Sequence, residues 1–131
     1  MFIKEFNLNG YGISDILLLQ YKINNKKRIV NKIITSFEVK IYNWRRALAQ
    51  AYRYKYYSHR VIVIIPSENV IPSVKNLYRF KALEVGLWTF DSKLGLIHKF
   101  YTPRIRKSKS KNSLNKALIK LEYLTKLELI S

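Results

Sequence analysis

Residues 33–66, with the sequence IITSFEVKIYNWRRALAQAYRYKYYSHRVIVIIP, determine the fold class of this chain. Within the first ten of them, the apolar residues Phe37, Val39 and Ile41 alternate with Ser36, Glu38 and Lys40. Because successive side chains of a strand point to opposite faces, the alternation predicts a β-strand over 33–42. We expect one apolar and one polar face on this strand.

A helix and a second strand follow. Asn43 suits an N-cap, and the apolar residues after it recur with helical spacing over 44–57. These residues are Trp44, Ala47, Leu48, Ala51 and Tyr54 or Lys55. Residues 61–65 form a β-branched run ended by Pro66, which predicts a buried central strand. A strand, a helix and a strand in this order predict a right-handed parallel crossover, so the expected class is α/β.

The flanking segments extend this unit on both sides. Residues 2–6 and 16–19 are typical of short strands. On the other side, the pattern of 73–83 predicts a helix, and 85–90 with 96–101 predicts a closing hairpin. We therefore expect a mixed central β-sheet flanked by helices.

The last part of the chain divides into a basic segment and a helix. Residues 103–113 carry five cations and no acid, interleaved with serines, which indicates a mobile linker or arm. Beyond it, leucines and one alanine recur along one face of an amphipathic helix over 114–131, which docks either on the domain or on a second subunit. We expect a single domain overall, with an α/β core over 1–102.

The charge of the chain indicates an anionic partner. Its 25 Lys and Arg against 8 Asp and Glu give a formal net charge of +17. On a small domain this charge is self-repulsive unless it serves binding, and nucleic acid is the expected partner. A membrane surface and an acidic protein are the other partners that fit such a charge.

Several classes of site and location are disfavoured by the sequence. The chain has no cysteine, which excludes disulfides, thiolate zinc sites and a cysteine nucleophile, and we expect a reducing cytoplasm. We find no signal peptide and no apolar run near the roughly 20 residues of a membrane span, so no membrane partner is expected. No Gly-x-Gly-x-x-Gly or Gly-Lys-Ser/Thr loop is present, so no nucleotide cofactor is expected.

Two of the acids occupy unusual positions. Asp15 directly precedes the apolar run 16–19, and Glu38 lies inside a predicted strand. A carboxylate near a core is unfavourable unless it is paired, and a divalent cation would offset that cost. Glu38 and Lys40 share a strand face, which combines a hard oxygen ligand with an ammonium that stabilises charge on a phosphoryl group. Taken alone, this pair is equally compatible with a surface ion pair.

These residues match a known pattern. Ser14-Asp15 followed by Glu38-Val39-Lys40 resembles the PD-(D/E)XK nuclease superfamily, in which an Asp begins one strand and a Glu-x-Lys pair follows on the next. Gln50 and Tyr54 on the following helix resemble the Gln-x-x-x-Tyr element of its RecB-like branch. The resemblance covers about residues 10–66. It implies a restriction-endonuclease-like core and a metal-dependent nuclease that cleaves DNA.

The resemblance also implies a role for each residue. Asp15, Glu38 and the Val39 backbone carbonyl would hold Mg²⁺ or Mn²⁺, Lys40 would contact water or phosphate, and Gln50 would orient the site. Among relatives of this fold, the archaeal Holliday-junction resolvases suggest an endonuclease acting on branched DNA, and the chain length suits a homodimer. Two departures are Ser14 in place of a proline and the absence of an N-terminal helix with a further Glu. Glu5 is the candidate substitute, although its strand-like surroundings favour a solvated edge charge.

A set of cations and one tyrosine are expected to contact nucleic acid, because no acid is interspersed among the helix cations. The set consists of Arg45, Arg46, Arg53, Tyr54, Arg104, Arg106, Lys107 and Lys109. Tyr54 has a second interpretation, in which it supports Gln50 from one helical turn away or packs in the core. The alternatives to a nuclease are a non-catalytic nucleic-acid-binding protein that keeps the fold, and a ribosome-like RNA binder.

Overall fold

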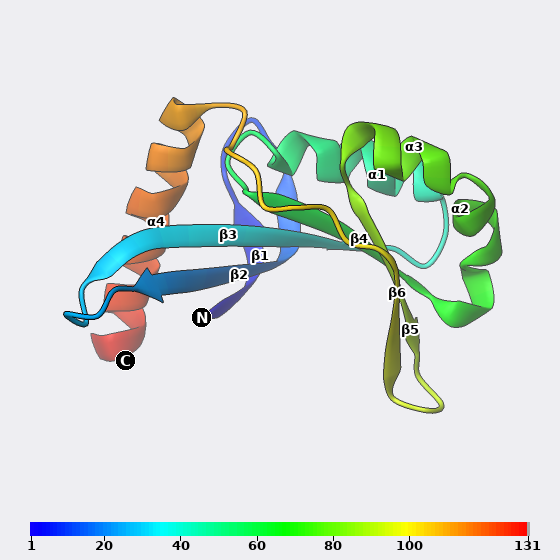
Figure 1. Ribbon diagram of the computed structural model, residues 1–131, viewed down its shortest axis with the longest axis horizontal. Helices are drawn as coiled ribbons and strands as arrows, with labels where there is room; N and C mark the ends of the chain where they lie inside the picture. Colours follow the sequence, from blue (N-terminus) through cyan, green and yellow to red (C-terminus); the bar gives the residue numbers. More distant parts are fainter. Residues whose placement is uncertain (131) are drawn as a thin grey trace.

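A computed structural model of the chain describes residues 1–130, which form a six-stranded mixed sheet and a set of helices (Figure 1). The strands are β1 (Phe2–Asn7), β2 (Ile13–Ile23), β3 (Ile29–Val39), β4 (Arg60–Pro66), β5 (Gly86–Asp91) and β6 (Leu96–Tyr101). Their order in the sheet follows the chain. Strands β3, β4 and β5 run parallel, whereas β1, β2 and β6 join through antiparallel pairings. The predicted α/β class and mixed sheet are confirmed.

The helices are α1 (Trp44–Tyr54), a 3₁₀ turn η1 (Ser67–Asn69), α2 (Ile71–Lys75), α3 (Leu77–Leu83) and α4 (Lys111–Ile130). Asn43 caps α1 as predicted, because its side chain accepts a hydrogen bond from the Arg46 N–H at 3.2 Å. The single helix predicted over 73–83 is wrong: Asn76, with φ −113° and ψ 24°, separates α2 from α3. No helix within residues 1–130 is both long and apolar enough to cross a membrane.

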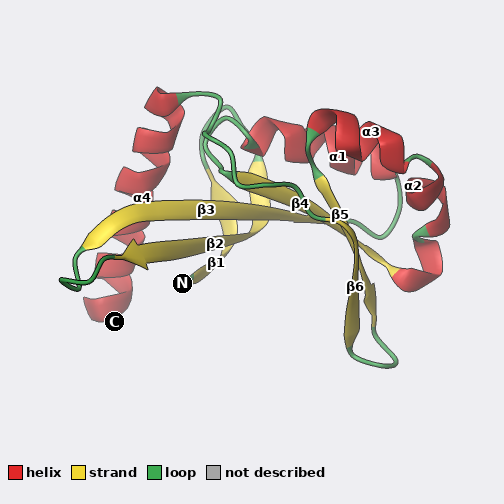
Figure 2. Cartoon of the chain, viewed as in Figure 1, coloured by secondary structure: helices red, strands yellow, loops and turns green. Residues whose placement is uncertain are grey.

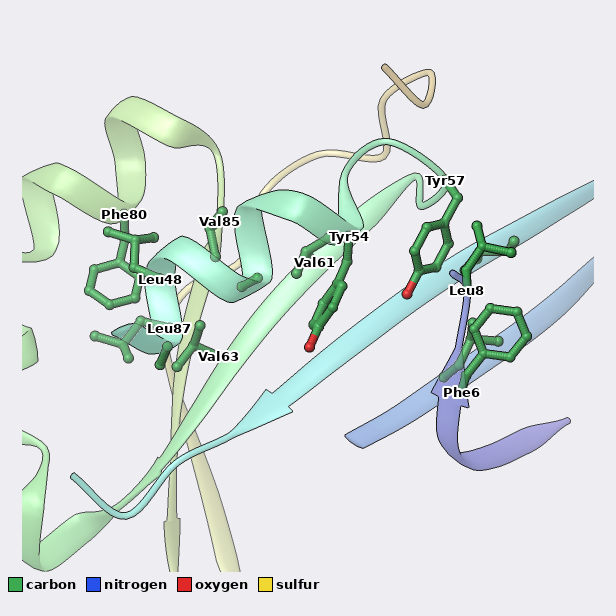
Figure 3. Packing of buried hydrophobic residues seen from close by; sticks show 14 of the residues in the cluster. Phe6, Leu8, Leu48, Tyr54, Tyr57, Val61, Val63, Phe80, Val85 and Leu87 are labelled. Carbon is green, nitrogen blue, oxygen red and sulfur yellow. The ribbon is translucent and has the colours of Figure 1, made fainter. Parts of the chain in front are cut away.

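The helices that build the core cover one face of the sheet (Figure 2). Ala47 and Ala51 of α1, Phe80 of α3, and Ala117 and Leu121 of α4 belong to one buried cluster. From the sheet, this cluster includes alternate residues of β4, namely Val61, Val63 and Ile65, whereas Ile62 lies outside it. Figure 3 shows the part of this cluster around α1, with the hydroxyl groups of Tyr54 and Tyr57 directed toward the strands. One continuous core therefore lies between the sheet and its helices.

Strand β3 has the predicted alternation, but its polar face is buried as well as its apolar face. Ser36 and Glu38, on the polar face, are 0% and 3% exposed, and Phe37, on the apolar face, is 8% exposed. Val39, at the end of the strand, is 41% exposed. The polar row lies under α1, whose Ala47 and Ala51 are fully buried against the sheet. The strand also ends at Val39 rather than at residue 42, because the chain turns there toward α1.

The basic segment and the terminal helix are attached to the domain. The backbone N–H groups of Arg106 and Lys109 donate to the carbonyls of His59 and Lys55, both at 2.9 Å. Residues 103–110 are thus held along the start of β4 and the end of α1, and the predicted mobile linker is wrong on this point. Helix α4 begins at Lys111, three residues before the expected boundary, and packs on the sheet of its own chain.

Candidate active site

Two carboxylates meet where β2 and β3 run side by side. Ile16 pairs with Phe37, so the next position along these antiparallel strands brings Asp15 beside Glu38. The Asp15 carboxylate accepts a hydrogen bond from the Val39 N–H at 2.7 Å. Asp15 thus lies inside β2, which begins at Ile13, rather than just before a strand as predicted. The structure brings together the two acids that the sequence singled out.

The environment of Glu38 disfavours its charged form. Burial raises the pKa of this carboxyl from its ordinary value of 4.5 to about 8, and a hydrogen bond and charge repulsion from Asp15 add to the increase. The hydroxyl of Tyr54 and the charge of Lys40 act in the opposite direction. Without a cation, Glu38 therefore keeps a proton at neutral pH.

Tyr54 fixes the position of Glu38 from α1. Its hydroxyl donates to the Ile13 carbonyl at 2.6 Å and lies 3.2 Å from Oε1 of Glu38. The side chain is 2% exposed, and burial followed by the charge of Glu38 raises its pKa. The prediction that Tyr54 contacts nucleic acid is wrong, because the ring is enclosed and its hydroxyl is already engaged.

Lys40 lies directly after β3, at the mouth of the site. Its backbone N–H donates to the Ile64 carbonyl at 3.0 Å, which fixes the chain where it leaves the sheet. The side chain is half-buried, and its positive charge lowers the pKa of Glu38. The charge of Lys40 therefore acts on the Glu38 carboxyl, and its role toward water or phosphate stays a prediction.

Gln50 contributes an unsatisfied acceptor on the same helix as Tyr54. Its Oε1 is buried and has no hydrogen-bond partner among the described residues. An orphaned buried oxygen of this kind implies a missing partner. An amide oxygen is a hard donor of the kind that Mg²⁺ or Mn²⁺ prefers, and the role of Gln50 beside Asp15 and Glu38 stays a prediction.

The candidate site contains few acids. In the part of the chain that the structure describes, no three His, Cys, Asp or Glu residues gather to hold a metal ion. Glu5 is exposed on β1 and has φ 54°, and it is not part of such a group. A cation at the Asp15–Glu38 pair would therefore complete its coordination with amide, backbone or water oxygens, and the Val39 carbonyl stays a predicted ligand.

The cations expected to bind nucleic acid are exposed, in contrast to Tyr54. They are Arg45, Arg46, Arg53, Arg104, Arg106, Lys107 and Lys109. Arg53 donates to the Gly10 carbonyl at 2.9 Å, and Arg106 forms an ion pair with Glu84 at 3.0 Å. Arg45 and Lys109 lie over the rings of Trp44 and Tyr52. The ion pair with Glu84 neutralises part of the positive charge of the basic segment 103–113.

Two adjoining depressions lie where the chain runs from β3 to α1, and neither was expected from the sequence. The first, of about 390 Å³, is lined by the chain leaving β3 and includes Lys40 and Arg46; we call it the Lys40 hollow. The second, of about 310 Å³, includes Trp44 and Glu68; we call it the Trp44 pocket. Both are lined by Tyr42, which the sequence assigned to a strand and to no site.

Comparison with known proteins adds no further assignment. The chain matches no family model, no curated protein and no solved structure.

Proposed function

We propose that this protein is a divalent-metal-dependent nuclease of restriction-endonuclease-like fold that hydrolyses DNA phosphodiester bonds as an endonuclease. The proposal depends chiefly on one observation: Asp15 and Glu38, from two different strands, converge beside Lys40. The order of β3, α1 and β4, with Gln50 and Tyr54 on α1, supports the PD-(D/E)XK assignment. The net charge of +17 supports a nucleic-acid substrate.

Each residue has a distinct task in this reaction. Asp15 and Glu38 supply the carboxylate oxygens, and Tyr54 holds Glu38 in place through its hydroxyl. Lys40 stabilises the negative charge that develops on the phosphoryl oxygens as water attacks in line with the leaving oxygen. A divalent cation bound at the carboxylates would polarise the phosphoryl group and make water a stronger nucleophile.

The test is cleavage of supercoiled plasmid and of branched, duplex and single-stranded oligonucleotides with Mg²⁺ or Mn²⁺. We expect Glu38→Ala and Lys40→Ala to reduce the rate by on the order of 100-fold. Lys93→Ala is the matched control, because Lys93 is exposed in the β5–β6 turn. Equal cleavage by the Lys40→Ala and Lys93→Ala proteins would refute the mechanism.

The second candidate is a protein that binds nucleic acid without cutting it. The observation in its favour is that the described residues offer two gathered carboxylates and no third acid. It predicts strongly salt-dependent binding and no cleavage with any divalent metal. Cleavage that is abolished by Glu38→Ala would exclude it.

A further inference from the structure

The Lys40 hollow and the Trp44 pocket differ in chemistry although they adjoin. They share Ile41, Tyr42 and Asn43, the loop between β3 and α1. The Lys40 hollow carries Lys40 and Arg46 and no acid, so it attracts a phosphate. Because Lys40 follows Glu38 by two residues, this phosphate would lie next to the carboxyl pair.

The Trp44 pocket is unsuited to a phosphate. The acid Glu68 is one of its lining residues, and its lining also includes Ile65 and Pro72. Glu68 accepts hydrogen bonds and Asn69 both donates and accepts them. A volume of about 310 Å³ is at the lower end of the roughly 300–1,000 Å³ of small-ligand sites. The pocket therefore suits a small, flat, uncharged ring with N–H groups at its edge.

We propose that the Trp44 pocket binds an unpaired nucleobase of the substrate strand, with a phosphate of that strand held in the Lys40 hollow. The inference depends on the proposed function and names its substrate class, a nucleic acid that contains an unpaired nucleotide. A base within a duplex is stacked and its pairing edge is occupied, so it cannot enter a pocket without leaving the helix. Single-stranded, bulged and branched substrates present such a base without that cost.

Tyr42 is the residue that links the two depressions. It is 73% exposed and lines both of them, so its ring is free to stack on a base while the adjoining cations hold the backbone. Stacking of a base on an aromatic side chain tolerates every base. Glu68 adds a preference for bases with N–H donors at the pairing edge.

The experiment measures binding without metal, in EDTA, so that it does not depend on cleavage. The probes are a fluorescent duplex and the same duplex with one bulged 2-aminopurine. We expect Tyr42→Ala to weaken binding of the bulged duplex about tenfold, equivalent to loss of one stacked base. Binding of the paired duplex should change less than twofold. Tyr42→Phe retains the ring and should bind both as the unmodified protein does.

The matched control is Tyr78→Ala, because Tyr78 is a tyrosine on α3 that is 63% exposed and lines neither depression. It should leave both affinities within twofold. The 2-aminopurine emission should change when the unmodified protein binds, and it should not change when Tyr42→Ala binds. Equal losses on both duplexes, or no loss on either, would overturn the pocket assignment. If Tyr42→Ala weakens binding of the bulged duplex alone and the unmodified protein never cleaves DNA, the pocket assignment stands and the nuclease proposal is refuted. If the protein cleaves DNA and Tyr42→Ala does not change binding, the nuclease proposal stands and the pocket assignment is refuted.

Discussion

The hydroxyl of Tyr54 lies 3.2 Å from Oε1 of Glu38 and 2.6 Å from the carbonyl of Ile13. One side chain of α1 thereby joins the edge of β2 to the acid of β3, at the point where Asp15 also binds β3 through the Val39 N–H. The position of Glu38 is thus set by contacts from the helix above it and the strand beside it.

Removing the Tyr54 hydroxyl should destabilise the protein. In Tyr54→Phe the Ile13 carbonyl loses its 2.6 Å donor and the ring stays in place, so we expect the free energy of unfolding to fall by about 1–2 kcal/mol. Urea denaturation measures the change. Tyr57→Phe is the control, because the buried Tyr57 hydroxyl makes no hydrogen bond within residues 1–130. A larger loss in Tyr57→Phe would contradict the assigned role of Tyr54.

The stability of the metal-free protein should decrease as the pH rises through the window between 4.5 and about 8. Glu38 has a pKa near 8 in the folded chain against 4.5 ordinarily, so within that window the folded state binds the extra proton. Stability is therefore lost across that window, and the loss is complete above about pH 8, where it amounts to about 2 kcal/mol after allowance for solvent screening. Denaturant unfolding in EDTA at pH 5 and pH 9 measures this difference.

Glu38→Gln provides the comparison for that pH profile. The amide cannot ionise, so the decrease in stability between pH 5 and pH 9 should shrink in this variant. At pH 9 it should be more stable than the unmodified protein, because no charge is buried there. An unchanged pH profile would show that Glu38 titrates normally.

Binding of Mn²⁺ should depend on both carboxylates. Asp15→Asn keeps a side-chain oxygen for the Val39 N–H and removes the charge, so we expect the fold to persist and the affinity for Mn²⁺ to fall at least tenfold. Isothermal titration calorimetry measures the affinity. Asp91→Asn is the matched control at a distant turn, where Asp91 accepts hydrogen bonds from the N–H groups of Lys93 and Leu94. Equal affinities in the two variants would exclude Asp15 as a ligand.

Docking of α4 on the domain predicts unequal effects for two residues of that helix. Leu121 is 1% exposed and Ile119 is 68% exposed. We expect Leu121→Ala to lower the free energy of unfolding by about 3 kcal/mol and Ile119→Ala by less than about 0.5 kcal/mol. Thermal or urea unfolding distinguishes them. Similar small effects would mean that α4 does not belong to the core.

The central strand, helix and strand were predictable because their signals are local. Residues 61–65 are β-branched throughout, and the apolar residues after Asn43 have helical spacing. The buried face of β3 was not predictable in the same way. Alternation shows which side chains share a face, but the burial of the polar face depends on α1, which packs over β3.

The candidate site was predictable in its acids and not in its surroundings. Asp15, Glu38 and Lys40 follow from strand positions, whereas Tyr54 is placed by the direction of its side chain toward the sheet. The attachment of residues 103–110 to the domain was also not predictable from the sequence, because their composition is that of a solvated linker. Their backbone groups bind the carbonyls of Lys55 and His59, and composition carries no information on such bonds.

The position of α4 has a consequence for synthesis of the chain. Ala117 and Leu121 complete a core to which Phe6 and Leu17 belong from the opposite part of the sequence. During translation, the sheet emerges from the ribosome well before this helix, and the apolar surface beneath it stays open to water until residues near 121 have followed. Until α4 folds, nascent chains of this protein therefore expose the apolar surface that Ala117 and Leu121 cover in the folded chain.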